Sequence, residues 1–117
     1  MAGRSHNWAY LKPTKHPTTL DIAWLAGIVE GEGYMTGDGV RSKITVTQKD
    51  SWLPNKIQEL FGGSIYMSPS QHCHRWQANS ERARGIIMTI YKFLSPRRKI
   101  QAAIALHKVS PEYFKEA

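Results

Sequence analysis

Three things are scarce in this chain of 117 residues: cysteine, acidic residues and long apolar runs. Cys73 is the single cysteine, so no disulfide can form within the chain, as is usual in a reducing compartment. No segment approaches the roughly 18 apolar residues that span a bilayer. The stretch Met1–Tyr10 also lacks the apolar run of a signal peptide. We therefore expect a soluble, intracellular protein with no membrane-spanning segment.

Acidic residues are outnumbered by basic ones. Lys plus Arg number 16 and Asp plus Glu number 9, which gives a formal net charge of +7. An excess of this sign suits a partner of dense negative charge, such as nucleic acid or an anionic membrane. The plainer alternative is a basic protein that its charge keeps soluble. The length is that of one domain with one core.

The first part of the chain is polar. Residues 1–17 contain Pro13 and Pro17, which predicts an N-terminal arm or loop followed by one domain over residues 18–117. Thr18 or Thr19 can cap a first helix there. The run up to residue 30 is almost wholly apolar, which predicts a helix that is buried on all sides and ends at the glycines of residues 31 and 33.

The remaining elements follow from alternation and periodicity. Apolar and polar residues alternate along Val40–Gln48, as in a half-buried strand, and Tyr34–Gly37 precedes it across a Gly-Asp-Gly turn. A second strand pair is expected within residues 64–78. Helices are expected at 50–61, 80–94 and from 96 to about 109, where Ser110 and Pro111 end the last one. The residues expected on the inner face of that last helix are Ile100, Ala103, Ile104 and His107.

The order of these elements predicts the fold class. Helix, strand pair, helix, strand pair and two final helices indicate an α+β protein, with an antiparallel sheet that carries its helices on one face.

The end of the first helix has two unusual features. Ala23, Gly27 and Gly31 recur every four residues, so another helix backbone can approach closely along this stripe. Glu30 and Glu32 lie where the helix dipole is negative and repels carboxylates, so a Lys, an Arg or a divalent cation must offset the cost. Acids able to hold Mg²⁺ beside a basic strand face suggest metal-assisted phosphodiester hydrolysis. A tight helix-to-strand turn with solvated glutamates is the alternative.

Residues 25–33 read Leu-Ala-Gly-Ile-Val-Glu-Gly-Glu-Gly. This stretch resembles the signature of the LAGLIDADG homing endonucleases almost position by position, with Glu in place of both Asp residues. Trp24 precedes it, as an aromatic residue often does in the family, and Val46–Lys49 resembles the end of the family's second strand. The order of elements is similar from about residue 19 to 108.

The resemblance implies an αββαββα fold whose four-stranded antiparallel sheet forms a saddle over DNA, with the helices on one face. Family members with one signature pair two subunits through the signature helices. This chain, with one signature, is therefore expected to form a homodimer on double-stranded DNA with a long pseudo-palindromic site. The expected interface residues are Ala23, Gly27, Glu30 and Gly31.

The resemblance also implies a catalytic set. The last acid of the signature binds the catalytic metal in the family, which assigns Mg²⁺ to Glu32. Gln48 matches a position that helps to place the attacking water or the metal. A basic residue near the start of the last helix often assists, for which Lys99 and then Arg98 are the candidates. Trp52 stands near the place of a second basic residue that some members carry.

The polar faces of the strands are expected to contact DNA. Arg and Gln can read base edges with two hydrogen bonds, whereas Lys mostly serves phosphates. The expected contacts are Arg41, Lys43, Thr45 and Thr47 on one strand, and Ser64, Tyr66, Arg75 and Gln77 on the other pair.

These features favour a site-specific DNA endonuclease that makes a double-strand break by Mg²⁺-dependent hydrolysis. One alternative is a non-cleaving relative that acts as a DNA-binding regulator or as an intron RNA maturase. Another is a small basic dimerisation protein with no nucleic-acid role, whose DNA binding would show no steep loss with rising salt.

Overall fold

The computed structural model describes residues 8–11, 16–38 and 40–107. The elements of this part are β1 (Trp8–Leu11), α1 (Thr19–Glu32), β2 (Gly33–Gly37), β3 (Ser42–Gln48), α2 (Trp52–Phe61), β4 (Gly63–Ser68), β5 (Cys73–Asn79), α3 (Ser80–Ile90), the 3-10 turn η2 (Tyr91–Phe93) and α4 (Pro96–Leu106). In this part of the chain no helix is long and apolar enough to cross a membrane.

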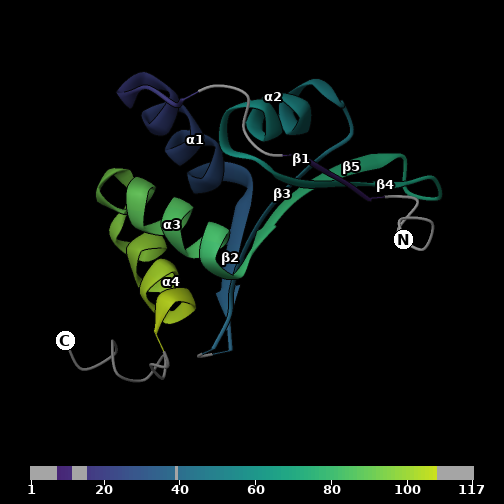
Figure 1. Cartoon of the computed structure of the whole chain (residues 1–117). Coiled ribbons are helices and arrows are strands. Elements are labelled where there is room, and N and C mark those ends of the chain that lie inside the picture. Colours follow the sequence, from purple (N-terminus) through teal and green to yellow (C-terminus); the bar gives the residue numbers. More distant parts are fainter. Residues whose placement is uncertain (1–7, 12–15, 39, 108–117) are drawn as a thin grey trace.

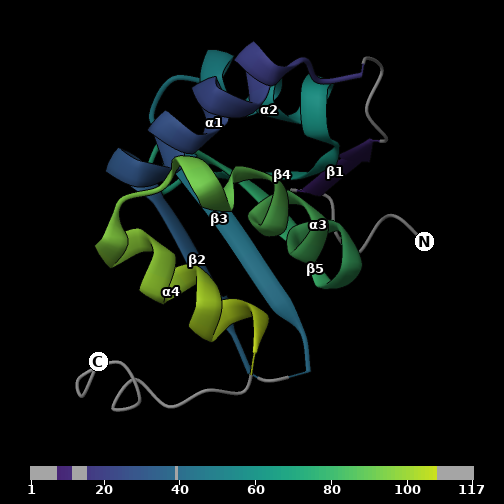
Figure 2. The ribbon, with the colours of Figure 1, turned by 90° about the vertical axis from the view of Figure 1, so that its left-hand side faces the viewer.

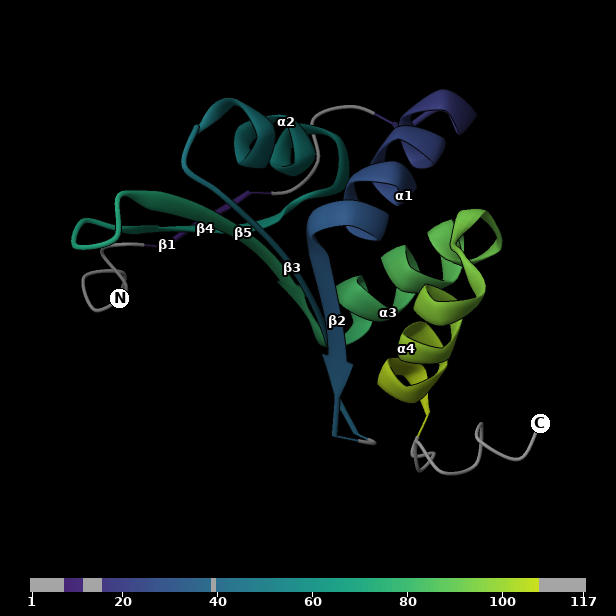
Figure 3. The same ribbon diagram turned by 180° about the vertical axis from the view of Figure 1, so that it is seen from behind.

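The strands form one antiparallel sheet in the order β1-β4-β5-β3-β2. The helices lie on one face of this sheet, and the opposite face is concave and carries no helix of the described chain (Figures 1 and 3). The α+β class and the antiparallel arrangement of the four strands β2 to β5 are therefore confirmed, and β1 adds a fifth strand at one edge.

Strand β1 lies within the segment for which the sequence predicts an arm or loop. It pairs with the outer edge of β4, with Trp8 opposite Tyr66 and Leu11 opposite Gly63. A sheet edge offers unpaired N–H and C=O groups that a short extended segment can satisfy. Four residues are too few for alternation to reveal a strand. Pro13 lies outside the described residues, and Pro17 directly precedes the cap of α1.

Helix α1 begins at the predicted cap and ends two residues later than predicted. The Thr18 hydroxyl accepts from the Asp21 N–H (3.2 Å), and the Asp21 carboxylate accepts from the Thr18 N–H (2.9 Å), which forms a capping box. At the other end, the N–H of Gly33 donates to the Val29 carbonyl. A Cβ at Gly33 would lie 2.7 Å from the Val29 Cα, so only glycine permits this direct passage from helix to strand.

The expectation that α1 is buried on all sides was wrong for the single chain. Leu25, Ala26 and Val29 are buried against the sheet and the other helices, whereas Leu20 is 82% exposed and Gly27 is exposed too. An apolar sequence allows burial but does not supply the covering surface. The uncovered side of α1 is a candidate contact for another molecule.

The core lies between the sheet and the helices. Ile44 and Val46 of β3 pack there with Ile57 of α2 and Ile87 of α3, and each of these side chains is fully buried. Trp76 of β5 is also fully buried, and its indole N–H donates to the Gly62 carbonyl at 2.7 Å. This bond satisfies the one polar atom of the largest core side chain.

Helix α4 runs beside β2 (Figures 1 and 2) and buries a different face from the one predicted. Its backbone comes so close that the Ser42 hydroxyl donates to the Ala105 carbonyl (2.9 Å), and small residues therefore line the contact. Ile100 is 38% exposed instead. The prediction that Ile100, Ala103, Ile104 and His107 form the inner face of this helix was wrong. It was based on hydrophobicity, whereas the close approach of α4 to β2 leaves room only for small side chains at the contact. The buried residues of α4 are Arg98, Ala102 and Ala105.

Gly37 gives a test of this close contact. A Cβ at Gly37 would collide with the carbonyl of Ala105, whereas a Cβ at Gly85 on α3 meets no atom within 4 Å. We expect Gly37→Ala to lower the free energy of unfolding by about 1–3 kcal/mol through overpacking. Gly85→Ala should raise it by roughly 0.5–1 kcal/mol, because alanine favours helix. Urea denaturation of both variants measures the difference, and equal changes would contradict the contact.

Candidate functional site

The open face of the sheet gathers most of the predicted DNA contacts. Thr45 lies opposite Gln77, and Gln77 lies opposite Ser64. In the next row, Thr47 lies opposite Arg75, and Arg75 lies opposite Tyr66. Residues in register across an antiparallel sheet project from the same face. The register thus joins two rows of polar side chains across β3, β5 and β4, and it adds Lys43 beside Asn79.

Burial agrees with this assignment of faces. Ile44 and Val46, which alternate with the polar residues of β3, are fully buried, as is Trp76 on β5. Lys43 and Arg75 are exposed, and neither side chain makes a hydrogen bond or ion pair with the residues that the structure describes. Their charges are therefore available to a partner outside the chain.

Arg41 lies just before β3, in the turn from β2. Its backbone N–H and that of Val40 donate to the Asp38 carboxylate (2.7 and 2.9 Å), and these bonds lower the pKa of Asp38. The exposed Arg41 side chain is placed at one end of the open face, beside a shallow hollow. Residues that line the hollow include Thr36, Asp38, Arg41, Lys43, Asn79 and Ser80.

Three residues of the open face were missed from the sequence. Tyr34 lies opposite Thr45 and is 58% exposed, and Thr36 lies opposite Lys43. Asn79 continues the polar side of β5 and accepts a hydrogen bond from the Gln77 amide (3.0 Å). The alternation of β2 carried enough signal to find Tyr34 and Thr36.

Glu32 and Gln48 lie at the same end of the β2–β3 pair. Glu32 is the last residue of α1 and is exposed, and its carboxylate makes no hydrogen bond or ion pair with another described residue. Gly33 lies opposite Val46. Glu32 precedes Gly33 by one residue and Gln48 follows Val46 by two, so both lie beyond this pair at the same end. Gln48 shares the side of β3 that carries Ile44 and Val46, but it is only partly buried at the strand end.

Glu30 binds within its own chain. Its carboxylate accepts from the backbone N–H of Ser95 (2.9 Å) and from the Ser95 hydroxyl (2.6 Å). These bonds lower the pKa of Glu30; partial burial opposes the change, and the charges of Arg98 and Arg97 add to it. The carboxylate thus joins the end of α1 to the start of α4. Whether Glu30 also meets a second subunit stays a prediction.

Arg98 supplies the positive charge expected at the end of α1. Its guanidinium Nε donates to the Glu30 carbonyl at 3.1 Å, and the residue is only 7% exposed. That carbonyl is one of the last of the helix, which lack a partner within it. A cation at this end also offsets the negative pole of the helix dipole.

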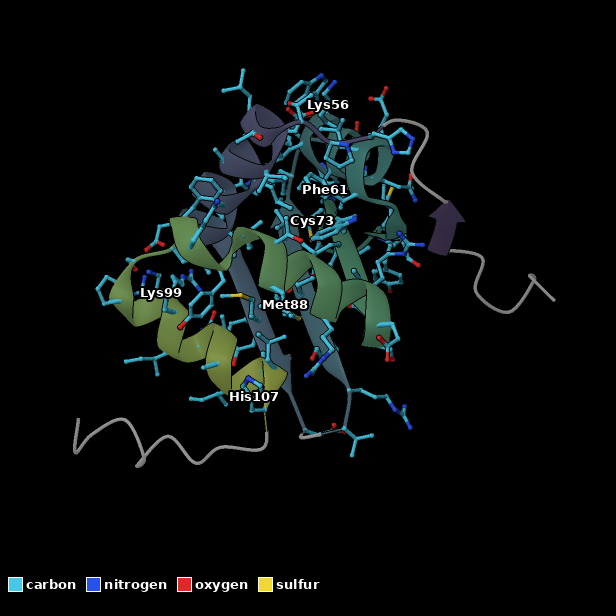
Figure 4. All side chains as sticks on the ribbon, turned by 60° about the vertical axis from the view of Figure 1, so that its left-hand side comes forward. Lys56, Phe61, Cys73, Met88, Lys99 and His107 are labelled. Carbon is cyan, nitrogen blue, oxygen red and sulfur yellow. The ribbon has the colours of Figure 1, made fainter. Side chains whose placement is uncertain are left out.

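The neighbours of Arg98 differ from it in environment. Lys99 is half-buried, and its ammonium lies 5.6 Å from the centroid of the Tyr91 ring, on the helical side of the molecule (Figure 4). Arg97 is exposed, and its charge acts on Glu30. Of the three basic residues at the start of α4, Arg97 is thus the one most open to solvent, and the sequence did not favour it.

Trp52 takes a structural partner at the start of α2. Its ring meets Trp24 of α1 edge to face, with 6.4 Å between the centroids and 84° between the planes. Trp52 is still 60% exposed. Such an aromatic pair stabilises the contact between the two helices.

The stripe of small residues on α1 faces outward. Gly27 and Gly31 are exposed, and a Cβ at either position would meet no atom within 4 Å. Packing within the chain therefore does not require glycine at these positions, although each one costs about 1 kcal/mol of helix stability relative to alanine. Close approach of a second helix is a physical reason for keeping them.

The donor set fits a hard divalent cation only in part. Among the described residues there is no group of three or more His, Cys, Asp or Glu side chains that could hold a metal ion. Glu32 offers one exposed carboxylate, which is the ligand type that Mg²⁺ prefers. A site built on it needs the phosphates of a substrate, waters or a second subunit for its other ligands.

The link between α1 and α4 predicts a pH dependence of stability. A carboxyl whose pKa is lowered in the folded state stabilises that state above its unfolded pKa, and this contribution is lost as the pH falls through the folded value. We therefore expect Glu30→Gln to be less stable than wild type at neutral pH and nearly equal to it below the ordinary glutamate range. Thermal melts across this pH range check the result. Glu81→Gln on α3 controls for the loss of one charge.

No protein-family model matches this sequence, and no curated protein matches it. Its fold is similar to that of two solved structures of the homing endonuclease I-CvuI, one in complex with the I-CreI target in 2 mM Mg with the DNA not cleaved, the other in complex with its own target in 2 mM Ca. The TM-scores are 0.64 and 0.65, at 20% sequence identity. Each match covers 74% of this chain and 64% of I-CvuI, so the chain spans less than two thirds of that protein. The chain has the fold of the LAGLIDADG homing endonucleases.

Proposed function

We propose that this chain is one subunit of a homodimeric, site-specific DNA endonuclease of the LAGLIDADG family, which makes a double-strand break by Mg²⁺-dependent hydrolysis. One observation carries the proposal: the exposed carboxylate of Glu32 ends α1 at the border of a concave sheet face with two rows of polar and basic side chains. The DNA complexes of I-CvuI support it.

The chain's own residues have distinct tasks in this reaction. The Glu32 carboxylate would hold the divalent cation at the edge of the open sheet face. Gln48, at the neighbouring strand end, orients the attacking water through its amide. A basic residue from the start of α4, Lys99 or the more exposed Arg97, stabilises the charge that develops on the phosphate. When bound, the cation would supply Lewis acidity to the reaction.

The open sheet face binds the DNA. Lys43 and Arg41 meet phosphates, while Arg75 and Gln77 are the side chains best suited to base edges. A two-fold axis along the outer stripe of α1 places two such faces end to end and brings one copy of Glu32 to each strand. Isologous pairing of this kind requires a nearly palindromic target.

Selection of cleaved sequences from a random pool tests the proposal and identifies the target at the same time. A library of randomised duplexes is incubated with the protein and Mg²⁺, and the ends of linear products are captured and sequenced. We expect a long, nearly two-fold symmetric site whose cleavage stops in EDTA and in the Glu32→Gln variant. Enrichment of bound but uncut duplexes would contradict the nuclease and retain DNA recognition.

Binding without cleavage corresponds to a second candidate function, a non-cleaving DNA-binding regulator or an intron RNA maturase. Trp52 favours a non-cleaving function. Its ring contacts Trp24, and it stands near the position where some LAGLIDADG enzymes carry a basic residue that assists cleavage. A binding competition between the selected duplex and structured RNA separates the regulator from the maturase. Absence of salt-dependent binding to either would favour a basic dimerisation protein.

Two lysines of equal charge test which surface binds DNA. Lys43 lies on the open face, whereas Lys56 lies on α2 (Figure 4), 3.7 Å from Glu59. Each phosphate contact contributes about 0.9 to the slope of log affinity against log salt. Lys43→Ala should therefore reduce the slope by roughly 2 for a dimer, and Lys56→Ala should leave it unchanged. Fluorescence anisotropy over a salt series measures both slopes, and equal losses would contradict the assignment.

A further inference from the structure

A chain of hydrogen bonds runs from α4 to both sides of Glu32. The Arg98 guanidinium donates from Nε to the Glu30 carbonyl (3.1 Å) and from Nη1 to the Gln101 Oε1 (2.7 Å). The same Gln101 oxygen accepts from the backbone N–H of Met35 (3.2 Å). Glu30 precedes Glu32 by two residues and Met35 follows it by three. The two side chains of α4 thus hold the last turn of α1 and the first residues of β2 together.

The junction they hold has no loop to absorb movement. Gly33 is at once the residue after α1 and the first residue of β2. The Glu30 carboxylate adds a second attachment, to the N–H and hydroxyl of Ser95 at the start of α4. Because these bonds are part-buried and join residues 65 to 68 positions apart, they set the direction of the backbone at Glu32 from outside the helix.

We propose that Arg98 and Gln101 are positioning residues, which orient the Glu32 carboxylate toward its metal ion by fixing the junction between α1 and β2. This inference depends on the proposed function, in which Glu32 binds the metal. It also gives Arg98 a different task from the direct assistance that the family resemblance implies, because its guanidinium is buried and bonded inside the chain. Groups that hydrogen-bond a metal ligand directly commonly change metal affinity by about 10–100-fold when mutated. Arg98 and Gln101 act on Glu32 through its backbone neighbours, so the effect expected here is at the lower end of that range.

The chemistry of Gln101 provides a matched pair of variants. A side-chain carbonyl oxygen has two lone pairs and here accepts two hydrogen bonds, from Arg98 and from Met35. Gln101→Glu keeps an acceptor oxygen at the same distance from the backbone and adds a negative charge opposite Arg98. It should therefore preserve the junction between α1 and β2. Gln101→Met has similar length but no comparable acceptor, so it leaves both donors without their partner.

The test compares these variants by three measurements. Hydrogen exchange of the Met35 amide reports the junction itself. Tb³⁺ luminescence, sensitised by the protein's aromatic residues, reports metal affinity without cleavage, with Glu32→Gln as the background. The Mg²⁺ concentration that gives half-maximal single-turnover cleavage of the selected duplex reports the working site, and anisotropy in EDTA reports DNA affinity.

We expect Gln101→Met to speed Met35 exchange by about fivefold or more, the effect of one hydrogen bond. The Tb³⁺ and Mg²⁺ midpoints should rise by roughly tenfold, with DNA affinity in EDTA unchanged. Gln101→Glu should match wild type in all of these. Unchanged metal midpoints in Gln101→Met, together with faster Met35 exchange, would overturn the positioning role while the nuclease function stands.

Failure of the proposed function has a different signature. In that case Glu32→Gln would bind Tb³⁺ as wild type does, and no duplex would be cut by any variant. If Gln101→Met does not fold, Arg98→Lys takes its place, since it keeps the charge but cannot donate to the Glu30 carbonyl and to Gln101 from one planar guanidinium. The same direction of shift is then expected, and an unchanged Tb³⁺ midpoint overturns the inference.

Discussion

Glu32→Gln is expected to abolish DNA cleavage while leaving DNA affinity nearly unchanged. Glutamine has the shape of glutamate but lacks the charge that holds a divalent cation, so the Lewis-acid contribution of several kcal/mol is lost. Since each 1.36 kcal/mol is tenfold in rate, the single-turnover rate should fall by a factor on the order of 10³ or more. The exposed position of Glu32 and its lack of partners among the described residues predict little effect on folding.

Quenched-flow or gel-based cleavage of the selected duplex measures the rate, and anisotropy in EDTA measures the affinity. Glu81→Gln serves as the control because it removes one exposed carboxylate far along the chain, at the start of α3. Cleavage by Glu32→Gln at the wild-type rate would remove Glu32 from the metal site and, with it, the observation on which the nuclease function depends.

The second large effect is expected at the stripe of small residues on α1. If two copies of this helix pack through Gly27 and Gly31, a leucine at Gly27 separates them. Overpacking of this kind costs about 1–3 kcal/mol at each copy, so the dimer dissociation constant should rise by roughly 30-fold or more. The isolated chain has open space around Gly27, and the substitution should therefore not disturb its own core.

Gly27→Ala sharpens this prediction. Alanine favours helix by about 1 kcal/mol over glycine, so the change alone should stabilise α1. At a close interface the same methyl group weakens the dimer. Gly85→Ala on α3 is the matched control, because Gly85 is also exposed with open space around its Cα. Sedimentation velocity over a concentration series follows the dimer, and unchanged dimerisation in Gly27→Leu would refute the α1 interface.

Much of the candidate site was predictable because it depends on local pattern. The parity of β3 alone assigned Lys43, Thr45 and Thr47 to the face opposite Ile44 and Val46, and burial confirms it. The Thr18 cap, the strand pairs and the glycine that ends α1 were predictable for the same reason, since each depends on neighbours in the chain. The small-residue stripe was visible as a repeat, although no local rule says what it meets.

Other features depend on residues that are distant in the sequence. The role of Arg98 requires the Glu30 carbonyl, 68 positions away, and no spacing rule links them. The buried face of α4 was mispredicted because the closeness of Ala105 to Gly37 and Ser42 selects small side chains, which a hydrophobicity pattern cannot foresee. Strand β1 forms because β4 offers it a free edge.

The sequence by itself therefore determined the elements other than β1, the polar face of β3 to β5 and the identity of the acid that ends α1, because these follow from periods of 2 and 3.6 residues. The tertiary structure decided the register that aligns Thr47, Arg75 and Tyr66, and it decided which cations face outward. It also brought Arg98 to the Glu30 carbonyl and Gln101 to the Met35 N–H, on either side of Glu32. These relations depend on how the helices pack on the sheet, which is set by contacts between distant parts of the chain.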